Sequence, residues 1–122
     1  MARDPLPPLA AVVSFVDCIN RGDLDGLVGL MTPDHRLVIL DEAPLVGRDA
    51  NRDAWAGYFA AFPEYVIHPR SLVADGARVR VVGTTTGSHL GLADDEEMRI
   101  DVAWHAEVTD GLLSLWRVAE AE

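Results

Sequence analysis

The chain has 122 residues, which is enough for one domain with a single hydrophobic core. Its composition is 49% hydrophobic and 25% charged, so it is too apolar to be intrinsically disordered. The formal net charge of −10 gives a surface that repels phosphate backbones and anionic lipid headgroups, so we expect neither nucleic acid nor membrane as a partner.

Cysteine content and hydropathy indicate the compartment. The single cysteine, Cys18, has no intrachain disulfide partner and cannot build a thiolate metal cluster. No apolar run approaches the roughly 18 residues needed to span a bilayer, and residues 1–8 lack the apolar segment of a signal peptide. These features predict a cytoplasmic protein.

The predicted elements begin with helices. Residues 1–8 contain three prolines and are expected to form an extended lead-in to a single domain over residues 9–122. Apolar residues recur at helical spacing from Leu9 to Ile19, which predicts a helix that ends near Gly22.

A second and a third helix follow, with a strand between them. Asp23 can cap a short helix through Met31, and alternation predicts a strand over residues 35–41. The third helix is expected over 49–61 and ends before Pro63. Its aromatic stripe has the spacing i, i+3, i+4 and i+7 and consists of Trp55, Tyr58, Phe59 and Phe62.

The rest of the chain is strand-like. Strands are expected over 65–73, 77–89, 97–108 and 112–118, with Asp-Gly turns at residues 75–76 and 110–111 as hairpin signals. Helices followed by an antiparallel meander predict an α+β fold. We expect three helices packed in the concave face of a strongly curved, mostly antiparallel sheet.

Alternation in the segment 97–108 separates an inner from an outer face. The apolar face must look inward and consists of Met98, Ile100, Val102, Trp104, Ala106 and Val108. Asp101 and His105 fall on the other face, so we expect a solvated or interface pair there and no acid–base site. In the last strand Leu113 and Leu115 lie opposite Trp116, and two apolar sides predict a homodimer through the outer sheet face.

Residues 15–25 read FVDCINRGDLD, which resembles the F-x-x-x-x-N-x-G-D-x-D opening of SnoaL-like proteins of the nuclear transport factor 2-like superfamily. The likeness continues in order to Trp116-Arg117-Val118. It implies a cone-shaped, cystatin-like domain around one apolar pocket. The superfamily includes polyketide cyclases, ketosteroid isomerases, scytalone dehydratase and limonene epoxide hydrolase, so the likeness is more specific for fold than for function.

The resemblance argues against ketosteroid isomerase activity. Those enzymes have a tyrosine, a basic aspartate and a protonated acid at positions that match Phe15, Ile39 and Trp104 here. Phe15 has no hydrogen-bond donor, Ile39 has no basic group, and Trp104 has no carboxyl, so the three polar roles are lost.

Four residues are candidates for catalysis. Asp41 shares the face of Ile39 about 7 Å further along the strand, where burial would raise its pKa and suit a general base; alternatively it caps a loop. His35 is on the same face, either as a proton carrier or as a turn residue. His89 lies in Gly-Ser-His-Leu-Gly, a segment similar to one in SnoaL-like cyclases, and Tyr58 has a hydroxyl that can polarise a carbonyl.

The expected ligand-binding residues are apolar or aromatic and comprise Phe15, Ile39, Trp55, Phe59, Trp104 and Trp116; each aromatic can equally be a core residue. The four histidines show no metal-ligand spacing, and no nucleotide-binding motif is present, so we expect no metal and no cofactor.

Two functions remain open from the sequence. One is a cofactor-independent acid–base enzyme, of isomerase, cyclase or dehydratase type, that acts on a small apolar oxygenated metabolite. The other is a non-catalytic ligand-binding or dimeric interaction domain of the same fold.

Overall fold

A computed structural model describes residues 5–120 of the chain. The helices are α1 (Pro8–Arg21), α2 (Leu24–Gly29), α3 (Arg48–Ala61) and α4 (Asp94–Glu97). The strands are β1 (Met31–Ile39), β2 (Leu45–Val46), β3 (Val66–Asp75), β4 (Arg78–Thr86), β5 (Val102–Thr109) and β6 (Leu112–Glu120).

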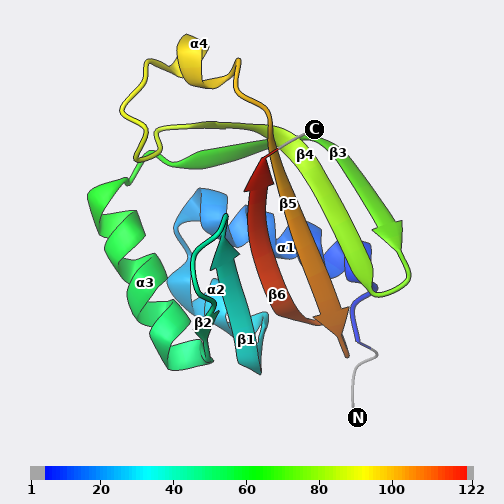
Figure 1. Ribbon diagram of the computed structural model, residues 1–122. Coiled ribbons are helices and arrows are strands. Elements are labelled where there is room, and N and C mark those ends of the chain that lie inside the picture. The colour runs from blue at the N-terminus through cyan, green and yellow to red at the C-terminus, as the bar shows by residue number, and fades with distance from the viewer. Residues whose placement is uncertain (1–4, 121–122) are drawn as a thin grey trace.

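The strands form one sheet in the order β2-β1-β6-β5-β4-β3. β1 and β6 pair in parallel, and the other neighbouring pairs are antiparallel. Figure 1 shows the sheet curving around α1, with α3 along its β2–β1 side. This confirms the predicted α+β fold with helices inside a curved, mostly antiparallel sheet.

Helix α1 fills the concave face of the sheet. It begins at Pro8, whose missing N–H is not needed in the first turn, and it ends at Gly22, which has φ 64°. One stripe of the helix is buried, as its apolar spacing predicts: Ala11, Val12, Phe15, Val16, Cys18 and Ile19. Neither α1 nor any other helix within residues 5–120 is long and apolar enough to cross a membrane.

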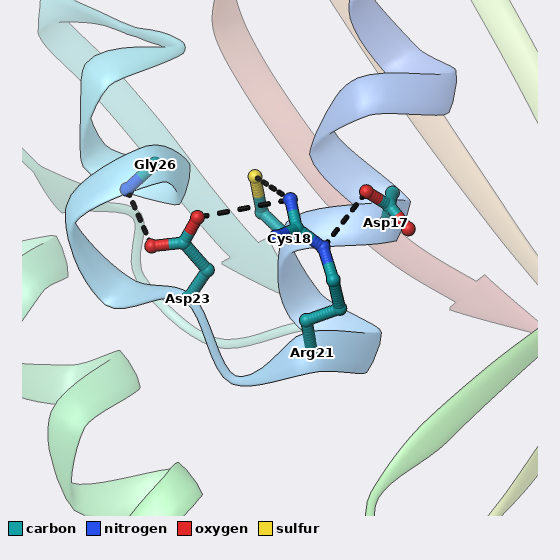
Figure 2. A network of polar contacts seen from close by, with 5 residues as sticks. All are labelled: Asp17, Cys18, Arg21, Asp23 and Gly26. Carbon is teal, nitrogen blue, oxygen red and sulfur yellow. Dashed lines mark hydrogen bonds and ion pairs between the residues drawn. The ribbon is translucent and has the colours of Figure 1, made fainter.

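A polar network holds the junction between α1 and α2 (Figure 2). The carboxylate of Asp23 caps α2 by accepting the N–H of Gly26 at 3.0 Å. Arg21 donates to Asp17 at 2.9 Å and lies 3.7 Å from Asp23. Burial, with the charge of Asp23 added, raises the pKa of the Cys18 thiol beside this network, so the thiol stays protonated.

Three other side chains tie helices to strands through backbone groups. Asn20 donates to the carbonyl of Ile67 at 2.9 Å and accepts its N–H at 2.8 Å, which fixes the end of α1 to β3. Arg48 donates twice to the carbonyl of Met31. The amide of Asn51 donates to the carbonyls of His35, Leu45 and Gly47.

The ladder between β3 and β4 contains a register shift. The register of β3 shifts between Pro69 and Ser71, opposite Gly83 of β4. A Cβ atom on Gly83 would overlap the carbonyl oxygen of His68, so only glycine permits this close approach. A register shift of this kind bends the strand and increases its local twist.

One predicted strand is shorter than expected. The segment predicted as strand from residue 97 begins at Val102, and the preceding residues include the short helix α4. The reason is pairing: the last partner that β4 offers to β5 is Gly83, which faces Val102. Residues 97–101 therefore lie beyond the ladder, and alternation does not set their orientation.

The later start of β5 reverses the faces predicted for Glu97, Met98 and Ile100. Met98 and Ile100 were expected inside and are 48% and 43% exposed, whereas Glu97 was expected outside and is 1% exposed. Within the paired strand the prediction is confirmed, since Trp104, Ala106 and Val108 are buried.

Candidate functional site

A cavity of about 170 Å³ lies between α3 and the β1–β6 part of the sheet. This volume is close to the roughly 150 Å³ apolar cavity that holds benzene in an engineered protein. Ile39, 40% exposed, and the exposed His89 belong to its wall, so the cavity opens to solvent beside them. The lining residues are Leu37, Ile39, Ala54, Trp55, Tyr58, Tyr65, His89, Trp116 and Val118.

Two neighbouring strands build one wall of the cavity. Leu37 of β1 is paired with Trp116 of β6, and Ile39 is paired with Val118. Residues two apart on a strand point to the same side, and paired residues share that side, so the four side chains form one continuous apolar surface.

Helix α3 and the segment after it supply the opposite wall. Ala54 and Tyr58 are four residues apart and therefore share one helix face with the adjacent Trp55. The rings of Trp55 and Tyr58 pack edge to face with centroids 6.2 Å apart. Tyr65, just after the helix, packs edge to face on Tyr58 at 5.0 Å.

The polar groups of the cavity gather where Tyr58 meets His89. The hydroxyl oxygen of Tyr58 lies 2.9 Å from Nδ1 of His89 and accepts the backbone N–H of the same residue at 3.3 Å. Burial raises the pKa of Tyr58, so the phenol keeps its proton at neutral pH and serves as a hydrogen-bond donor.

Tyr65 is a second protonated phenol in the wall. Burial first, and then Tyr58 and the charge of Glu97, raise the pKa of Tyr65 far above the neutral range. Together with Tyr58 and His89, it gives one side of an otherwise aliphatic and indole-lined cavity the capacity to hydrogen-bond an oxygen atom.

Five predicted site residues meet at this cavity. They are Ile39, Trp55, Tyr58, His89 and Trp116, and they come from four separate segments of the chain. The structure thus brings together two of the four candidate catalytic side chains and three of the six candidate ligand-binding side chains.

Asp41 is not placed as predicted. β1 ends at Ile39, and Leu40 takes φ 50°, so the alternation that was expected to turn Asp41 inward stops one residue earlier. Asp41 is exposed and is not part of the cavity wall.

His35 is also away from the cavity. It is 0% exposed, its Nδ1–H donates to the carbonyl of Leu113 at 2.6 Å, and its ring packs 5.9 Å from that of Phe15. Burial lowers the pKa of His35, and Nε2 is buried without a hydrogen-bond partner among the described residues. His35 is thus a structural residue, but it lies within β1 and joins this strand to β6, whereas the alternative expected from the sequence was a turn residue.

Three predicted ligand-binding aromatics lie behind the wall. Phe15 and Trp104 are fully buried against Trp116, with ring centroids 5.1 and 6.2 Å from it. Phe59 packs on Trp55 at 5.6 Å. Their helical or strand spacing predicts an inward direction correctly, but the first layer of side chains fills the space between them and the cavity.

Four wall residues were missed from the sequence: Leu37, Ala54, Tyr65 and Val118. Leu37 and Val118 share the strand faces of Ile39 and Trp116, so the same alternation could have identified them. Ala54 has the helical spacing of Tyr58, but a small side chain gives a weak apolar signal. Tyr65 lies in a connecting segment, where no periodicity marks it.

The predicted outer-face pair is indeed outside the cavity. Asp101 forms an ion pair with Arg70 at 3.0 Å. Partial burial, with Arg80 and Arg117 on the neighbouring strands, lowers the pKa of His105. Within residues 5–120, no group of three or more His, Cys, Asp or Glu side chains is arranged to hold a metal ion.

Comparisons with known proteins give a family match and several similar folds. The family model of the SnoaL-like domain matches residues 12–116. A search of curated proteins finds no match. A cystatin-fold protein from Novosphingobium aromaticivorans is 19% identical, with a TM-score of 0.81 over 94% of this chain and 99% of that chain.

Two further solved structures have the same fold. A candidate polyketide cyclase from Sinorhizobium meliloti is 21% identical, with a TM-score of 0.74 over 93% of this chain and 95% of that chain. A candidate ketosteroid isomerase from Kribbella flavida is 22% identical, with a TM-score of 0.75 over 94% and 78%. At these identities the likeness shows the fold alone, and the predicted cystatin-like fold is confirmed.

Proposed function

The chain belongs to the SnoaL-like domain family, and on that premise we propose that it is a cofactor-independent acid–base enzyme of isomerase, cyclase or dehydratase type. Its substrate is a small, largely apolar molecule with a carbonyl or hydroxyl group. The observation that carries the proposal is the Tyr58–His89 pair at the side of an aromatic cavity that opens to solvent. A cytoplasmic location is part of the same proposal.

The two groups have complementary roles. With the proton on Nδ1, the His89 ring donates to the Tyr58 oxygen and keeps the lone pair of Nε2 free as a base. The Tyr58 oxygen then accepts two N–H groups of His89, and its own proton remains available to a substrate oxygen. For an isomerisation, Nε2 takes a proton from the carbon next to a carbonyl, Tyr58 stabilises the enolate oxygen, and Nε2 returns the proton to another carbon.

The solved relatives support this reaction class at the level of fold. The Sinorhizobium and Kribbella proteins are a candidate cyclase and a candidate isomerase with the same cone of sheet and helices. The cavity volume of about 170 Å³ favours a substrate with one ring inside the pocket, and any larger part of the molecule would extend past Ile39 and His89.

A non-catalytic ligand-binding domain is the second candidate. It is favoured by the positions of Phe15, Ile39 and Trp104, which are apolar here where the resembling isomerases have their three polar groups. Such a domain would bind the same class of molecule without moving a proton.

We also propose a homodimer through the outer sheet face. Val73 of β3 is 60% exposed there, and Leu115 of β6 is half-buried. Both line a concave surface that spans β4 and β5 and also includes Arg80, His105 and Arg117. A second copy would cover these apolar side chains.

Solvent deuterium exchange of cyclohexanone, followed by NMR, tests the enzyme against the binding domain. We expect the protein to accelerate exchange of the protons next to the carbonyl. His89→Gln should lower the rate by roughly 10²- to 10⁴-fold and Tyr58→Phe by about 10²-fold or more.

Asp41→Asn decides between the two candidate bases in the same assay. We expect this variant to keep the wild-type rate, because Asp41 lies outside the cavity wall. Loss of exchange in Asp41→Asn with full exchange in His89→Gln would contradict the proposed base, and binding of cyclohexanone without any exchange would favour the non-catalytic domain.

A further inference from the structure

Glu97 is a buried carboxylate that neither the cavity wall nor the proposed reaction uses. It is 1% exposed, and none of the described cationic groups lies within ion-pair distance of it. A carboxylate in this position requires hydrogen-bond donors, because burial disfavours its charge. Two donors satisfy it: the hydroxyl of Thr85 and, at 3.4 Å, the backbone N–H of Ser88.

These contacts connect the two ends of the segment that carries His89. Thr85 is on β4, Ser88 lies in the loop that follows, and Glu97 closes this loop from α4, which lies beyond the end of β4 in Figure 1. The Ser88 hydroxyl also accepts the N–H of Leu90 at 3.2 Å, so the residues on either side of His89 are both fixed.

The start of the segment is held by packing as well. Gly87 has φ 69°, and a Cβ atom there would overlap the carbonyl oxygen of Glu64. Gly87 fixes one side of the turn against the segment after α3, and Glu97 fixes the other. His89 between them meets Tyr58 through both its ring and its backbone N–H.

Resting on the function proposed above, we propose that Glu97 is a positioning residue: its carboxylate holds Ser88 and thereby keeps the His89 ring against the Tyr58 hydroxyl. It acts through the loop, since it is absent from the cavity wall. The negative charge of Glu97 contributes to the raised pKa of both Tyr58 and Tyr65, which agrees with its position behind the polar side of the cavity.

Glutamine can replace Glu97 in this role. Its carbonyl oxygen can accept the Ser88 N–H while its amide donates to the Thr85 oxygen, because a hydroxyl can act either as donor or as acceptor. Alanine removes both contacts. The proposal therefore predicts that Glu97→Gln retains the His89–Tyr58 pair and that Glu97→Ala loses it.

The test is the imidazole ¹⁵N NMR spectrum of His89, with Tyr58→Phe as the reference for a broken pair and His89→Gln for the assignment. We expect Glu97→Ala to shift the His89 ring signals to those of Tyr58→Phe, and Glu97→Gln to restore them. Glu96→Ala is the matched control, since Glu96 is an exposed acid on the same helix. A His89 spectrum unchanged by Glu97→Ala would overturn the proposal.

Thr85→Val covers the case in which Glu97→Ala fails to fold. It removes one of the two contacts, and we expect a partial shift of the His89 signals in the same direction; an unchanged spectrum would again contradict the proposal. The cyclohexanone assay separates the two claims. If the wild type does not accelerate deuterium exchange, the proposed function is refuted, and the NMR spectra still decide the positioning role. If Glu97→Ala exchanges at the wild-type rate, the positioning role alone is refuted.

Discussion

At the scale of single residues, the chemistry of the pocket depends on the Tyr58 phenol and the His89 imidazole. Each is poorly informative alone, since a tyrosine on a helix and a histidine in a loop are ordinary features. Their contact at 2.9 Å makes them a candidate site, because it pairs a protonated phenol with an imidazole that can donate or accept a proton.

Tyr58→Phe should weaken the binding of an oxygen-bearing ligand without emptying the pocket. Phenol is a suitable probe, and its dissociation constant should rise by about 3- to 10-fold, the effect of one neutral hydrogen bond. Benzene has no oxygen and should bind both proteins equally. Equal phenol affinity for wild type and variant would show that the Tyr58 hydroxyl does not face the ligand.

His35 gives a prediction about stability and pH. Burial lowers its pKa in the folded protein from the ordinary 6.5, so the unfolded chain binds more protons as the pH falls below that value. The free energy of unfolding should therefore decrease on acidification, with a contribution of at most ~1.4 kcal/mol per pH unit from this group.

Urea unfolding between pH 7.5 and 5.0 measures that contribution in the wild type and in His35→Gln. The variant can still donate to the Leu113 carbonyl but cannot titrate, so its stability should depend less on pH. Parallel curves for the two proteins would contradict a lowered pKa.

At the scale of elements, alternation predicted most faces of the central strands correctly and failed at a register shift and where the ladder ends. Leu113, expected on the outer face with Leu115, is 0% exposed and paired with Val108, because the register between β5 and β6 shifts after Glu107. Trp104 and Trp116 point inward as predicted, because β5 and β6 lie in the middle of the sheet. Asp41 and Glu97 were misplaced for one shared reason: both lie outside the paired residues, Asp41 two residues after the end of β1 and Glu97 in α4, five residues before the start of β5.

The fold was more predictable than the site for a physical reason. Burial of apolar faces determines where helices and strands lie, and the spacing of apolar residues in the sequence reports these faces. The depth of a cavity depends on how side chains such as Phe15 and Phe59 fill the space behind its wall, and neither periodicity nor resemblance reports that packing.

The α1–α2 junction allows a comparison of a helix cap with a surface ion pair. Asp23→Ala removes the cap of α2 and should lower the free energy of unfolding by about 1 kcal/mol. Asp17→Ala removes an exposed ion pair with Arg21 and should lower it by less than about 0.5 kcal/mol. Urea unfolding compares the two, and an equal effect would show that the cap does not stabilise α2.

At the scale of the whole molecule, the inner and outer faces of the sheet differ in their proposed roles. The inner face carries the cavity, and the outer face carries the proposed dimer interface. The outer face also places Arg80, His105 and Arg117 side by side on three adjacent strands, which gives a locally cationic row in a chain of net charge −10.

Sedimentation velocity tests the interface. The wild type should sediment as a dimer, and Leu115→Glu should convert it to a monomer, because the substitution replaces an apolar contact with a charged side chain whose burial costs free energy. Val13→Glu is the matched control, as it alters an exposed apolar residue on α1. A monomeric wild type would contradict the interface.

The central claim is that a small apolar molecule with an oxygen atom occupies the cavity between α3 and the β1–β6 wall. A phenol titration followed on the three tryptophan indole N–H signals measures this directly. The account predicts saturable shifts of Trp55 and Trp116, a smaller shift of Trp104, loss of binding in Ala54→Phe and normal binding in the exposed-surface control Ala60→Phe. Shifts confined to the outer sheet face, or wild-type binding in Ala54→Phe, would contradict it.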